Sequence, residues 1–239
     1  MPRFFVDPAH IGTTHISLDA EDLAHIRVLR LGPKETFVVS DGKGMDYRCV
    51  LDGDQAKILE RAENSAEPKV CCTVYLALTR GERMDYAIQK SVELGAQRIV
   101  LFPAKRCVVR YEGKDVPKKL ARLQKIALEA AKQSGRGIVP AVTAASDFRS
   151  AMTEAALLER ALFFYENETR QGLRAVLDAR PEFRSASLVI GPAGGFADEE
   201  AVLAEGLGLV SVTLGPRILR AETAPAVALA AVLFYAGDL

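Results

Sequence analysis

Two different hydrophobic patterns divide the chain near residue 66. Before that point, short segments of alternating apolar and polar residues are separated by turn residues, whereas after it continuous apolar runs alternate with amphipathic stretches. Alternation is typical of antiparallel strands with one solvated face, and continuous apolar runs are typical of parallel strands that are covered on both faces. We therefore expect a small β-rich domain over residues 1–66 and an α/β domain with a mostly parallel sheet over residues 67–239.

The first domain is expected to contain a helix, a hairpin and a third strand. The strand candidates are residues 36–40, 46–51 and 55–60. Gly42 and Gly44 lie between the first two strands, where a tight connection favours residues that tolerate positive φ. Residues 20–29 form the helix candidate. The segment 61–68 is polar, contains Pro68 and has no hydrophobic period, so it is predicted to be a linker.

In the second domain, apolar strand candidates alternate with helix candidates. The strands are expected at residues 70–78, 98–102, 161–165, 187–190 and 210–214. The helices are expected at residues 84–94, 117–134, 198–205 and 222–235. Pro117 suits the first turn of its helix, where an N–H would remain unbonded in any case, and Gly135 suits the position just after the helix end.

Two glycine-proline segments near the end of the chain give the strongest indication of a binding site. Residues 191–196 and 215–224 each follow a short apolar run, so both are predicted to be loops at strand ends. Glycine lets a ligand approach the main chain closely because it has no Cβ. Loops after neighbouring parallel strands meet at one edge of the sheet. With Arg217, Arg220 and Glu222 in the second loop, these features predict a small-molecule cleft with a charged lip.

Charge is balanced over the whole chain but not along it. The 31 Lys and Arg residues equal the 31 Asp and Glu residues in number. Residues 80–136 contain 14 basic and 6 acidic residues, whereas residues 1–66 contain 8 and 11, and residues 137–239 contain 8 and 13. A basic segment suits phosphate binding and equally a solvated helix face, so charge alone leaves both interpretations open.

Several common chemistries lack their sequence signatures. The chain has no Walker A loop, no glycine fingerprint after residues 70–78 and no Gly-x-Ser-x-Gly elbow. The histidines lie at positions 10, 15 and 25, all in the first domain, which excludes a Ser-His-Asp triad within the second domain. The four cysteines lack metal-ligand spacing and are interpreted as small buried hydrophobes. A glycine-lined crevice without these signatures suits a neutral or zwitterionic nucleoside cofactor.

The sequence shows no membrane or secretion signal. No apolar run approaches the roughly 18 residues that span a bilayer. The N-terminal segment becomes acidic at Asp7, too early for a secretory signal. We therefore expect a cytoplasmic protein.

The two glycine-proline segments resemble the cofactor loops of a known family. Gly191-Pro192-x-Gly194-Gly195-Phe196 and Leu214-Gly215-Pro216-Arg217-Ile218-Leu219-Arg220-x-Glu222-Thr223-Ala224 are similar to those of the RsmE family of 16S ribosomal RNA uridine-N3 methyltransferases, which belongs to the SPOUT superfamily. Further matching segments, in chain order, are residues 2–6, 25–30, 41–44, 84–95, 106–110 and 129–136. Many ordered matches make the resemblance far more specific than one glycine motif.

The resemblance implies a methyltransferase that uses S-adenosyl-L-methionine to methylate N3 of a uridine in the 16S rRNA of the small ribosomal subunit. It implies a PUA-like β-barrel for RNA binding over residues 1–66, and a SPOUT domain with a C-terminal trefoil knot over residues 67–239. A homodimer is also implied. Neither a metal site nor membrane contact is expected.

The same resemblance suggests binding residues. The expected cofactor-binding residues are Tyr165, Glu166, Ile190, Gly191, Gly194, Gly195, Leu214, Gly215, Ile218, Leu219 and Thr223. The expected RNA-binding residues are Arg3, His25, Arg30, Lys105, Arg106 and Arg110, followed by the basic residues between 114 and 125. For His25 and Arg30, a buried structural role is the alternative.

Methylation at N3 requires that a weakly acidic proton leaves uracil, so a base or a group that stabilises the anion is needed. Arg220 is the first candidate for holding the base and its developing charge, and Arg136 is the second. Glu222 or Glu166 is expected to act as the base or to orient an arginine. The alternative for Glu222 is a capping carboxylate at the start of the last helix.

One position departs from the family pattern. Ala193 stands where the family usually has Glu. This difference gives some support to an alternative function, a non-catalytic RNA-binding or ribosome-assembly factor that keeps the fold. The presence of Arg220, Glu222 and Thr223 at their family positions favours the enzyme.

Overall fold

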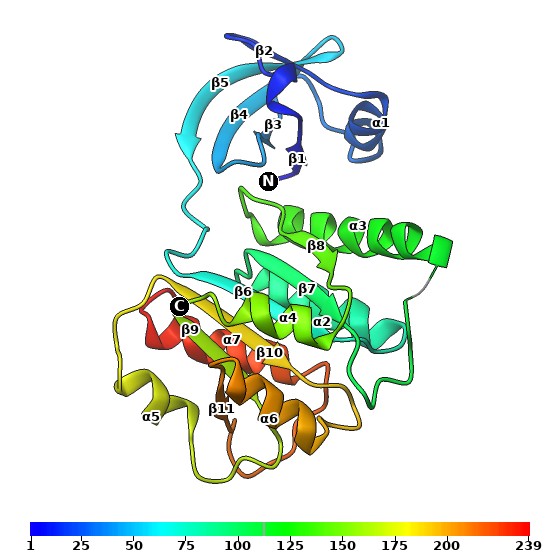
Figure 1. Cartoon of the computed structure of the whole chain (residues 1–239). Coiled ribbons are helices and arrows are strands. Elements are labelled where there is room, and N and C mark those ends of the chain that lie inside the picture. Colours follow the sequence, from blue (N-terminus) through cyan, green and yellow to red (C-terminus); the bar gives the residue numbers. More distant parts are fainter. Residues whose placement is uncertain (112) are drawn as a thin grey trace. The chain divides into compact units, whose positions relative to one another are not determined.

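The structure is a computed structural model and describes residues 1–111 and 113–239 (Figure 1). The chain divides into two compact units. The first unit comprises residues 1–67 and 131–139, and the second comprises residues 68–130 and 140–239.

A five-stranded sheet forms most of the first unit. Its strands are β1 (Arg3–Phe5), β2 (His15–Ser17), β3 (Thr36–Ser40), β4 (Met45–Asp52) and β5 (Gln55–Glu63), in the order β1-β3-β4-β5-β2. β1 and β3 are parallel, and the other pairs are antiparallel. The predicted hairpin and third strand are confirmed. β1 and β2 were not predicted, because strands this short show no hydrophobic period.

The core of the first unit joins the sheet to α1 (Ala20–Val28), the predicted helix, and η1 (Pro8–His10) is a short 3₁₀ turn. Its buried members are Phe4, Ile16, Ile26, Phe37, Val39, Cys49 and Ala56. Phe37 and Val39 are alternate residues of β3, so both point to the core side of the sheet. Ile26 is the buried residue of α1.

The predicted linker over residues 61–68 is wrong at its beginning. Residues 61–63 belong to β5 and pair with the start of β4. All three are exposed, so this end of the strand has no buried face that a hydrophobic pattern could reveal. Backbone hydrogen bonds to β4 hold it in place.

The second unit contains a six-stranded sheet in which every neighbouring pair is parallel. The strands are β6 (Cys71–Ala77), β7 (Arg98–Phe102), β8 (Ala141–Ala144), β9 (Arg160–Phe164), β10 (Ser185–Ile190) and β11 (Val210–Val212), in the order β11-β9-β10-β6-β7-β8. The predicted α/β architecture with a mostly parallel sheet is confirmed. β8 was not predicted, because Val142 is its one buried residue and the strand lies at the sheet edge.

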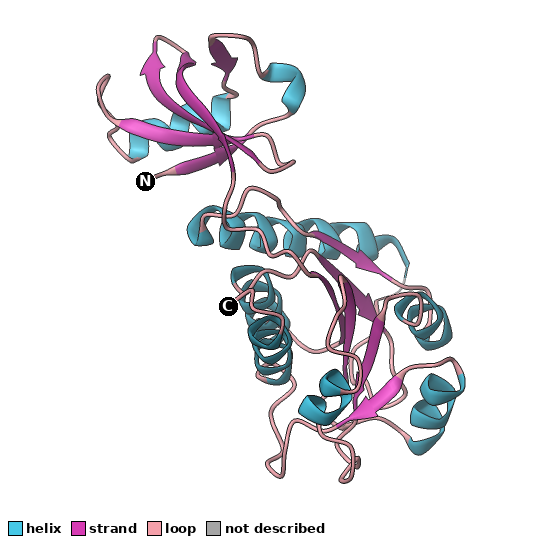
Figure 2. Ribbon diagram, turned by 90° about the vertical axis from the view of Figure 1, so that its left-hand side faces the viewer, coloured by secondary structure: helices cyan, strands magenta, loops and turns pink. Residues whose placement is uncertain are grey.

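Helices cover both faces of this sheet (Figure 2). α2 (Glu82–Glu93) packs against α7 (Ala224–Tyr235), which also contacts β6 and β10. α4 (Phe148–Ala155) contacts α6 (Asp198–Gly206) and lies over β6, β7 and β10. The remaining helices are α3 (Val116–Ser134), α5 (Leu173–Asp178) and the short η2 (Gly113–Asp115). α2, α3, α6 and α7 were predicted within two residues of their bounds, whereas α4 and α5 were missed.

Side chains of the central strands divide between the two faces. Tyr75, Phe102 and Phe163 are buried in the cluster that includes α4 and α6. Their neighbours in sequence are also buried, as expected of strands that are covered on both sides. In the described part of the chain, no helix combines the length and hydrophobicity that crossing a bilayer requires.

The cysteines do not behave alike. Cys49 and Cys72 are buried, and burial raises the pKa of their thiols to about 11 and about 12, so both remain protonated. Cys107 is half-buried. The expectation of burial is wrong for Cys71, which is exposed because it is the first residue of β6 and points away from the core.

Arg30 adopts a backbone conformation that usually belongs to glycine. Its φ is 55°, and it follows α1 at the position where a left-handed residue ends a helix. The Leu31 N–H donates to the Ile26 carbonyl at 3.2 Å, and the Arg30 N–H donates to the Arg27 carbonyl at 3.0 Å. These two bonds define a Schellman motif, in which a side chain at the left-handed position is strained.

Arg30→Gly should therefore stabilise the first unit, by about 0.5–1 kcal/mol, because glycine adopts this conformation without steric strain. The matched control is Arg27→Gly inside α1, which makes the same chemical change and should lower the free energy of unfolding by about 1 kcal/mol. Urea denaturation of the three proteins measures both effects. Destabilisation by Arg30→Gly would show that the arginine side chain makes a contact that outweighs its backbone strain.

Candidate active site

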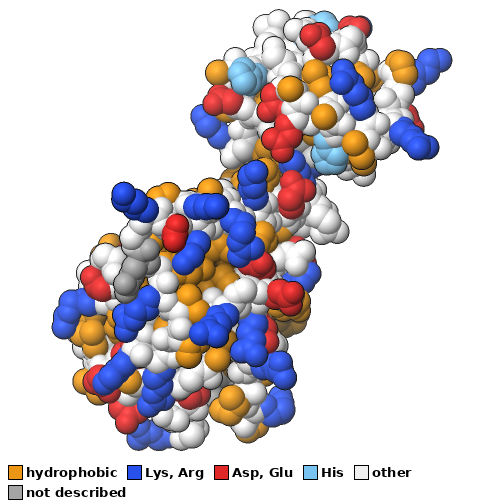
Figure 3. All heavy atoms as spheres, turned by 90° about the vertical axis from the view of Figure 1, so that its right-hand side faces the viewer, with side chains coloured by type: hydrophobic (Ala, Val, Ile, Leu, Met, Phe, Trp, Pro, Cys, Tyr) orange, Lys and Arg blue, Asp and Glu red, His pale blue; other side chains and the backbone are white. Residues whose placement is uncertain are grey.

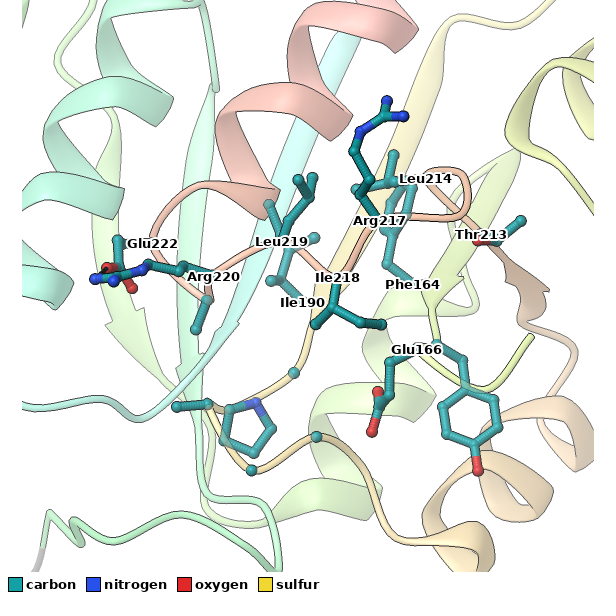
Figure 4. A pocket seen from close by; sticks show the side chains of 18 of the residues that line it. Phe164, Glu166, Ile190, Thr213, Leu214, Arg217, Ile218, Leu219, Arg220 and Glu222 are labelled. Atoms are coloured by element: carbon teal, nitrogen blue, oxygen red, sulfur yellow. Dashed lines mark ion pairs between the residues drawn. The ribbon is translucent and has the colours of Figure 1, made fainter. Parts of the chain in front are cut away.

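A pocket of about 570 Å³ opens at the carboxyl edge of the parallel sheet. It lies beyond the ends of the neighbouring strands β9, β10 and β11 (Figure 4). Its lining residues are 164–166, 190–195, 212–215, 217–222 and 224, together with Arg83. The two glycine-proline segments therefore lie on one pocket, as their positions at strand ends predict.

In the first glycine segment, residues 191–196, two glycines lie directly against side chains. Gly195 has a φ of 71°, and a Cβ at this residue would lie 1.7 Å from the Glu166 Oε1 atom. A Cβ at Gly191 would lie 2.9 Å from the Phe196 ring. Phe196 is fully buried, with its ring centroid 4.2 Å from that of Phe163. The buried ring anchors the loop, and the absence of side chains at both glycines lets the loop close against Glu166.

A hydrogen-bond network fixes the backbone from which Glu166 projects. The Tyr165 hydroxyl donates to Asp198 Oδ1 at 2.7 Å and accepts from Asn167 Nδ2 at 3.1 Å. The bond to Asp198 raises the pKa of Tyr165, so the phenol remains protonated at neutral pH. Since Asp198 begins α6, the network joins the end of β9 to the helix that follows the glycine segment.

The second glycine-proline segment is held at its start. The Thr213 N–H donates to the Gln171 carbonyl at 2.9 Å, and the Thr213 carbonyl accepts from the Leu173 N–H at 3.3 Å. The Thr213 hydroxyl also accepts from the Gly215 N–H at 3.1 Å. The loop after β11 is therefore joined to the segment that follows β9.

The lip of the pocket carries opposite charges. Arg220 Nη1 lies 3.8 Å from Glu222 Oε1, and the two side chains are 78% and 16% exposed. This separation exceeds a hydrogen-bond distance, so the arginine retains its donors for a ligand. Figure 4 shows Arg217 pointing away from this pair. Thr223 is the residue that precedes α7, and Glu222 lies outside the helix with Arg220 as its partner, which disfavours a purely capping role.

The expected cofactor-binding residues line this pocket with one exception. Thr223 is not a lining residue, although its neighbours Glu222 and Ala224 are. Arg83 and Thr213 line the pocket and were not predicted. Arg83 lies in the first turn of α2, so the rule that ligands bind beyond the ends of neighbouring strands would have indicated it once β6 was placed beside β10.

Arg136 does not line the pocket. It belongs to the first unit, where it is 2% exposed and donates to Glu67 Oε2 at 2.6 Å and to Glu67 Oε1 at 3.2 Å. Glu67 Oε1 also accepts the backbone N–H groups of Gly137 and Ile138, both at 3.0 Å. A buried ion pair of this kind positions a chain segment, so the structure gives Arg136 a structural role.

The residues expected to bind RNA in the first unit have different environments. Arg3 forms two hydrogen bonds to Asp46 and its side chain is 10% exposed, so it is largely engaged within the unit. The half-buried His25 packs edge-on against Phe4, with ring centroids 5.5 Å apart. Arg30 is exposed, which excludes the alternative of a buried role for this residue.

The basic residues after β7 divide into paired and unpaired groups. Lys105 pairs with Glu199, and Arg122 forms two hydrogen bonds of 2.7 and 2.8 Å to Asp85. The exposed residues of this stretch without an ion pair to any described residue are Arg106, Arg110, Lys114, Lys118 and Lys125, and of these Arg106 donates to the Gly194 carbonyl. Figure 3 shows many Lys and Arg side chains on the face of the second unit that carries the start of α3. This face is suited to a polyanion.

The pocket is lined by backbone, apolar, carboxylate and guanidinium groups. Over residues 1–111 and 113–239, no group of three His, Cys, Asp or Glu side chains is arranged to hold a metal ion. Ala193 is exposed and lines the pocket, so its position is open to a ligand even without the carboxylate that a glutamate would add.

The chain is similar to known RNA methyltransferases. Residues 66–233 match the family model of the RNA methyltransferase domain. The chain is 31% identical over 228 residues to ribosomal RNA small subunit methyltransferase E of Bacillus subtilis. That alignment covers 91% of this chain and 89% of the relative. It is 34% identical over 240 residues to the protein of the same name from Mycobacterium bovis. That alignment covers 96% of this chain and 90% of the relative.

Two solved structures share the whole architecture. Ribosomal RNA small subunit methyltransferase E from Neisseria gonorrhoeae, bound to S-adenosyl methionine, has a TM-score of 0.83 and 32% identity, and the match covers 98% of this chain and 97% of that one. A methyltransferase structure from Legionella pneumophila with the bound cofactor SAM has a TM-score of 0.85 and 27% identity, and the match covers 97% and 96%.

Gly195→Ala should weaken binding of S-adenosylmethionine, the cofactor that the resemblance implies, by about tenfold or more. The new Cβ displaces the Glu166 carboxylate into the pocket. Gly208→Ala is the matched control, because Gly208 has a φ of 98° and no atom within 4 Å of the added Cβ. Both variants should lose about 1 kcal/mol of unfolding free energy through backbone strain, and only the first should lose affinity in calorimetry. Equal affinities would contradict the importance of the Gly195–Glu166 contact.

Proposed function

The chain belongs to the RNA methyltransferase domain family and is an S-adenosylmethionine-dependent methyltransferase of small-subunit ribosomal RNA, and from that premise we propose that it methylates N3 of a uridine in 16S rRNA. The observation that carries the proposal is one pocket where two glycine loops meet the Arg220–Glu222 pair. We also propose a cytoplasmic location, which a ribosomal RNA substrate supports.

The residues present fit the methyl donor. A pocket of about 570 Å³ is in the size range of sites for small cofactors. The apolar residues Ile190, Leu214, Ile218 and Leu219 would hold the adenine ring, and the backbone of the two glycine segments would hold its polar edge and the ribose. Glu166 and Glu222 supply negative charge in a pocket for a donor that carries a sulfonium and an ammonium group. When bound, S-adenosylmethionine supplies an electrophilic methyl carbon.

The chain's own residues would then position uracil and assist removal of its N3 proton. Arg220 is exposed at the lip, so its guanidinium would donate hydrogen bonds to the uracil carbonyls and stabilise the anion that forms as the proton leaves. Glu222, only 16% exposed and 3.8 Å from Arg220, would orient the arginine or accept the proton. Both roles depend on placing N3 in line with the methyl carbon, which supplies much of the rate.

RNA binding is assigned to the basic face of the second unit and to the first unit. Arg110, Lys118 and Lys125, which have no ion pair within the described part of the chain, would contact phosphates. In the first unit, a curved five-stranded sheet with mixed pairing supports a PUA-like barrel as an RNA module. Arg30 is exposed and forms no ion pair with any described residue, which supports an RNA contact there.

The C-terminal segment is proposed to form the trefoil knot of this superfamily. After the edge strand β11 the chain returns across the sheet, since α7 packs on β6 and β10 rather than beside β11. The Thr213 backbone is bonded to Gln171 and Leu173 in the segment after β9. These contacts support a loop through which the end of the chain passes.

A homodimer is proposed through α7. Its sequence, residues 224–235, contains no charged residue, and Val227 and Phe234 are 39% and 74% exposed. A helix that is apolar on every side is normally buried, so a second copy of the chain is the partner that would cover it.

The alternative of a non-catalytic assembly factor is not retained. The relatives that match over most of their length are named methyltransferases, and one similar structure contains the methyl donor. Ala193 remains a difference from the family pattern, but its side chain lines a pocket that keeps the other charged groups.

Arg220→Ala should reduce kcat for rRNA methylation by about 100-fold, since it removes charge stabilisation that is needed in the transition state. The affinity for S-adenosylmethionine should change little. Arg217→Ala, in the same loop but pointing away from Glu222, is the control and should keep most of the activity. The assay is methyl incorporation into small-subunit rRNA followed by mapping of the modified base. An Arg220→Ala enzyme with normal kcat, or a product methylated elsewhere than N3, would contradict the mechanism.

Arg110→Ala should weaken RNA binding uniformly across sequences and reduce the slope of log affinity against log salt by about 1, as expected for one lost phosphate contact. Arg174→Ala on α5, whose side chain is 90% exposed outside the basic stretch, removes the same charge and should leave the slope unchanged. Fluorescence anisotropy at several salt concentrations measures the slope. Equal salt slopes for the two variants would contradict RNA binding by the basic face.

A further inference from the structure

The segment that follows β7 is bonded to the first glycine segment of the pocket. Residues 105 and 106 belong to the basic stretch that was expected to contact RNA, whereas residues 191–197 lead from β10 into α6. Two contacts join the two segments, one through the Glu200 carboxylate and one to the Gly194 carbonyl. The Lys105 side chain pairs separately with Glu199 in the first turn of α6.

Glu200 forms the buried part of this connection. It is 7% exposed, and its Oε1 atom accepts the Lys105 backbone N–H at 2.7 Å. Its Oε2 atom accepts the Ala197 backbone N–H at 2.9 Å. One buried carboxylate thus ties the main chain after β7 to the main chain at the end of the glycine segment. Charged acceptors form the stronger class of hydrogen bond, so this contact resists opening.

Arg106 forms the part nearest to the pocket. Its Nη1 atom donates to the Gly194 carbonyl at 3.1 Å, and a Cβ added at Gly194 would lie 3.3 Å from the Arg106 Cβ. The arginine therefore packs along Gly194 and also bonds to it. Gly194 lines the pocket directly, between Ala193 and Gly195.

We propose that Arg106 is a positioning residue for the methyl-donor loop, in addition to any contact that it makes with RNA. Its hydrogen bond to Gly194 keeps the glycine segment in the conformation that binds the donor. The Glu200 contact to the Lys105 N–H holds the backbone next to Arg106 in place. A guanidinium has five N–H donors, so one bond to Gly194 leaves others for a phosphate. The inference rests on the proposed function, because it takes the pocket to be the donor site.

Lys105 offers a matched control beside Arg106. It carries the same charge, and its side chain is 66% exposed and pairs with Glu199, whose pKa the ammonium group lowers. Its contact with Glu200 uses the backbone N–H, which a side-chain substitution preserves. Lys105→Ala thus removes one positive charge without removing either contact to the glycine segment.

The test measures S-adenosylmethionine binding to the full chain by calorimetry in the absence of RNA. Arg106→Ala should weaken binding about 5- to 10-fold, the effect of losing one charge-assisted hydrogen bond. Lys105→Ala should bind the donor like the wild type. Arg106→Lys keeps a terminal donor and the charge, and should recover most of the lost affinity. Both alanine variants should weaken RNA binding.

A second measurement tests the Arg106–Gly194 contact without the donor. Amide hydrogen exchange in the donor-free protein should be faster at residues 193–197 in Arg106→Ala, and unchanged there in Lys105→Ala. Unaltered donor affinity and unaltered exchange in Arg106→Ala would overturn the inference, as would equal losses in both alanine variants. Failure of the wild type to bind the donor would instead contradict the proposed function, and the exchange data would still test the Arg106–Gly194 contact.

Discussion

The parallel register of three strands is the constraint on which the site depends. Phe164 of β9 pairs with Ile190 of β10 on one side and with Val212 of β11 on the other. The three strands therefore end at the same level, and the loops that follow them start side by side. Without this register, the glycine segments would leave the sheet at different heights and no common pocket would form. Parallel pairing thus brings together residues that are separated by tens of positions in the chain.

Close packing beneath and beside the loops gives the pocket its shape. Phe196 is fully buried against Phe163, so the glycine segment has a fixed anchor in the core. Above that anchor, Glu166 occupies the space beside Gly195 that any other residue would fill with its own side chain. A pocket built in this way exists before a ligand arrives, and preorganised sites lose less conformational freedom on binding.

The basic residues serve several purposes that a count of charges does not separate. Arg136 and Arg3 are engaged in largely buried ion pairs of the first unit, and Arg122 is bonded to Asp85. Arg106 is bonded to the backbone of the pocket. The cations that remain for a polyanion are therefore fewer than the 14 Lys and Arg residues between positions 80 and 136. Long-range attraction of RNA still depends on all of them, because it follows the summed charge of the face.

The sequence by itself determined the α/β architecture and the location of the pocket. Continuous apolar runs predicted the parallel strands, because a strand that is covered on both faces has no polar side, and the glycine-proline segments predicted the loops. Short elements escaped prediction: β1, β2 and β8 are three or four residues long with one buried residue each, and the end of β5 is exposed, so backbone pairing holds them without a hydrophobic period in their side chains. Only the tertiary structure decided that Arg136 lies buried against Glu67, that Arg83 reaches the pocket, and that Arg106 bonds to Gly194. Those outcomes depend on which side chains meet across distant segments, and the local order of residues does not encode such distances.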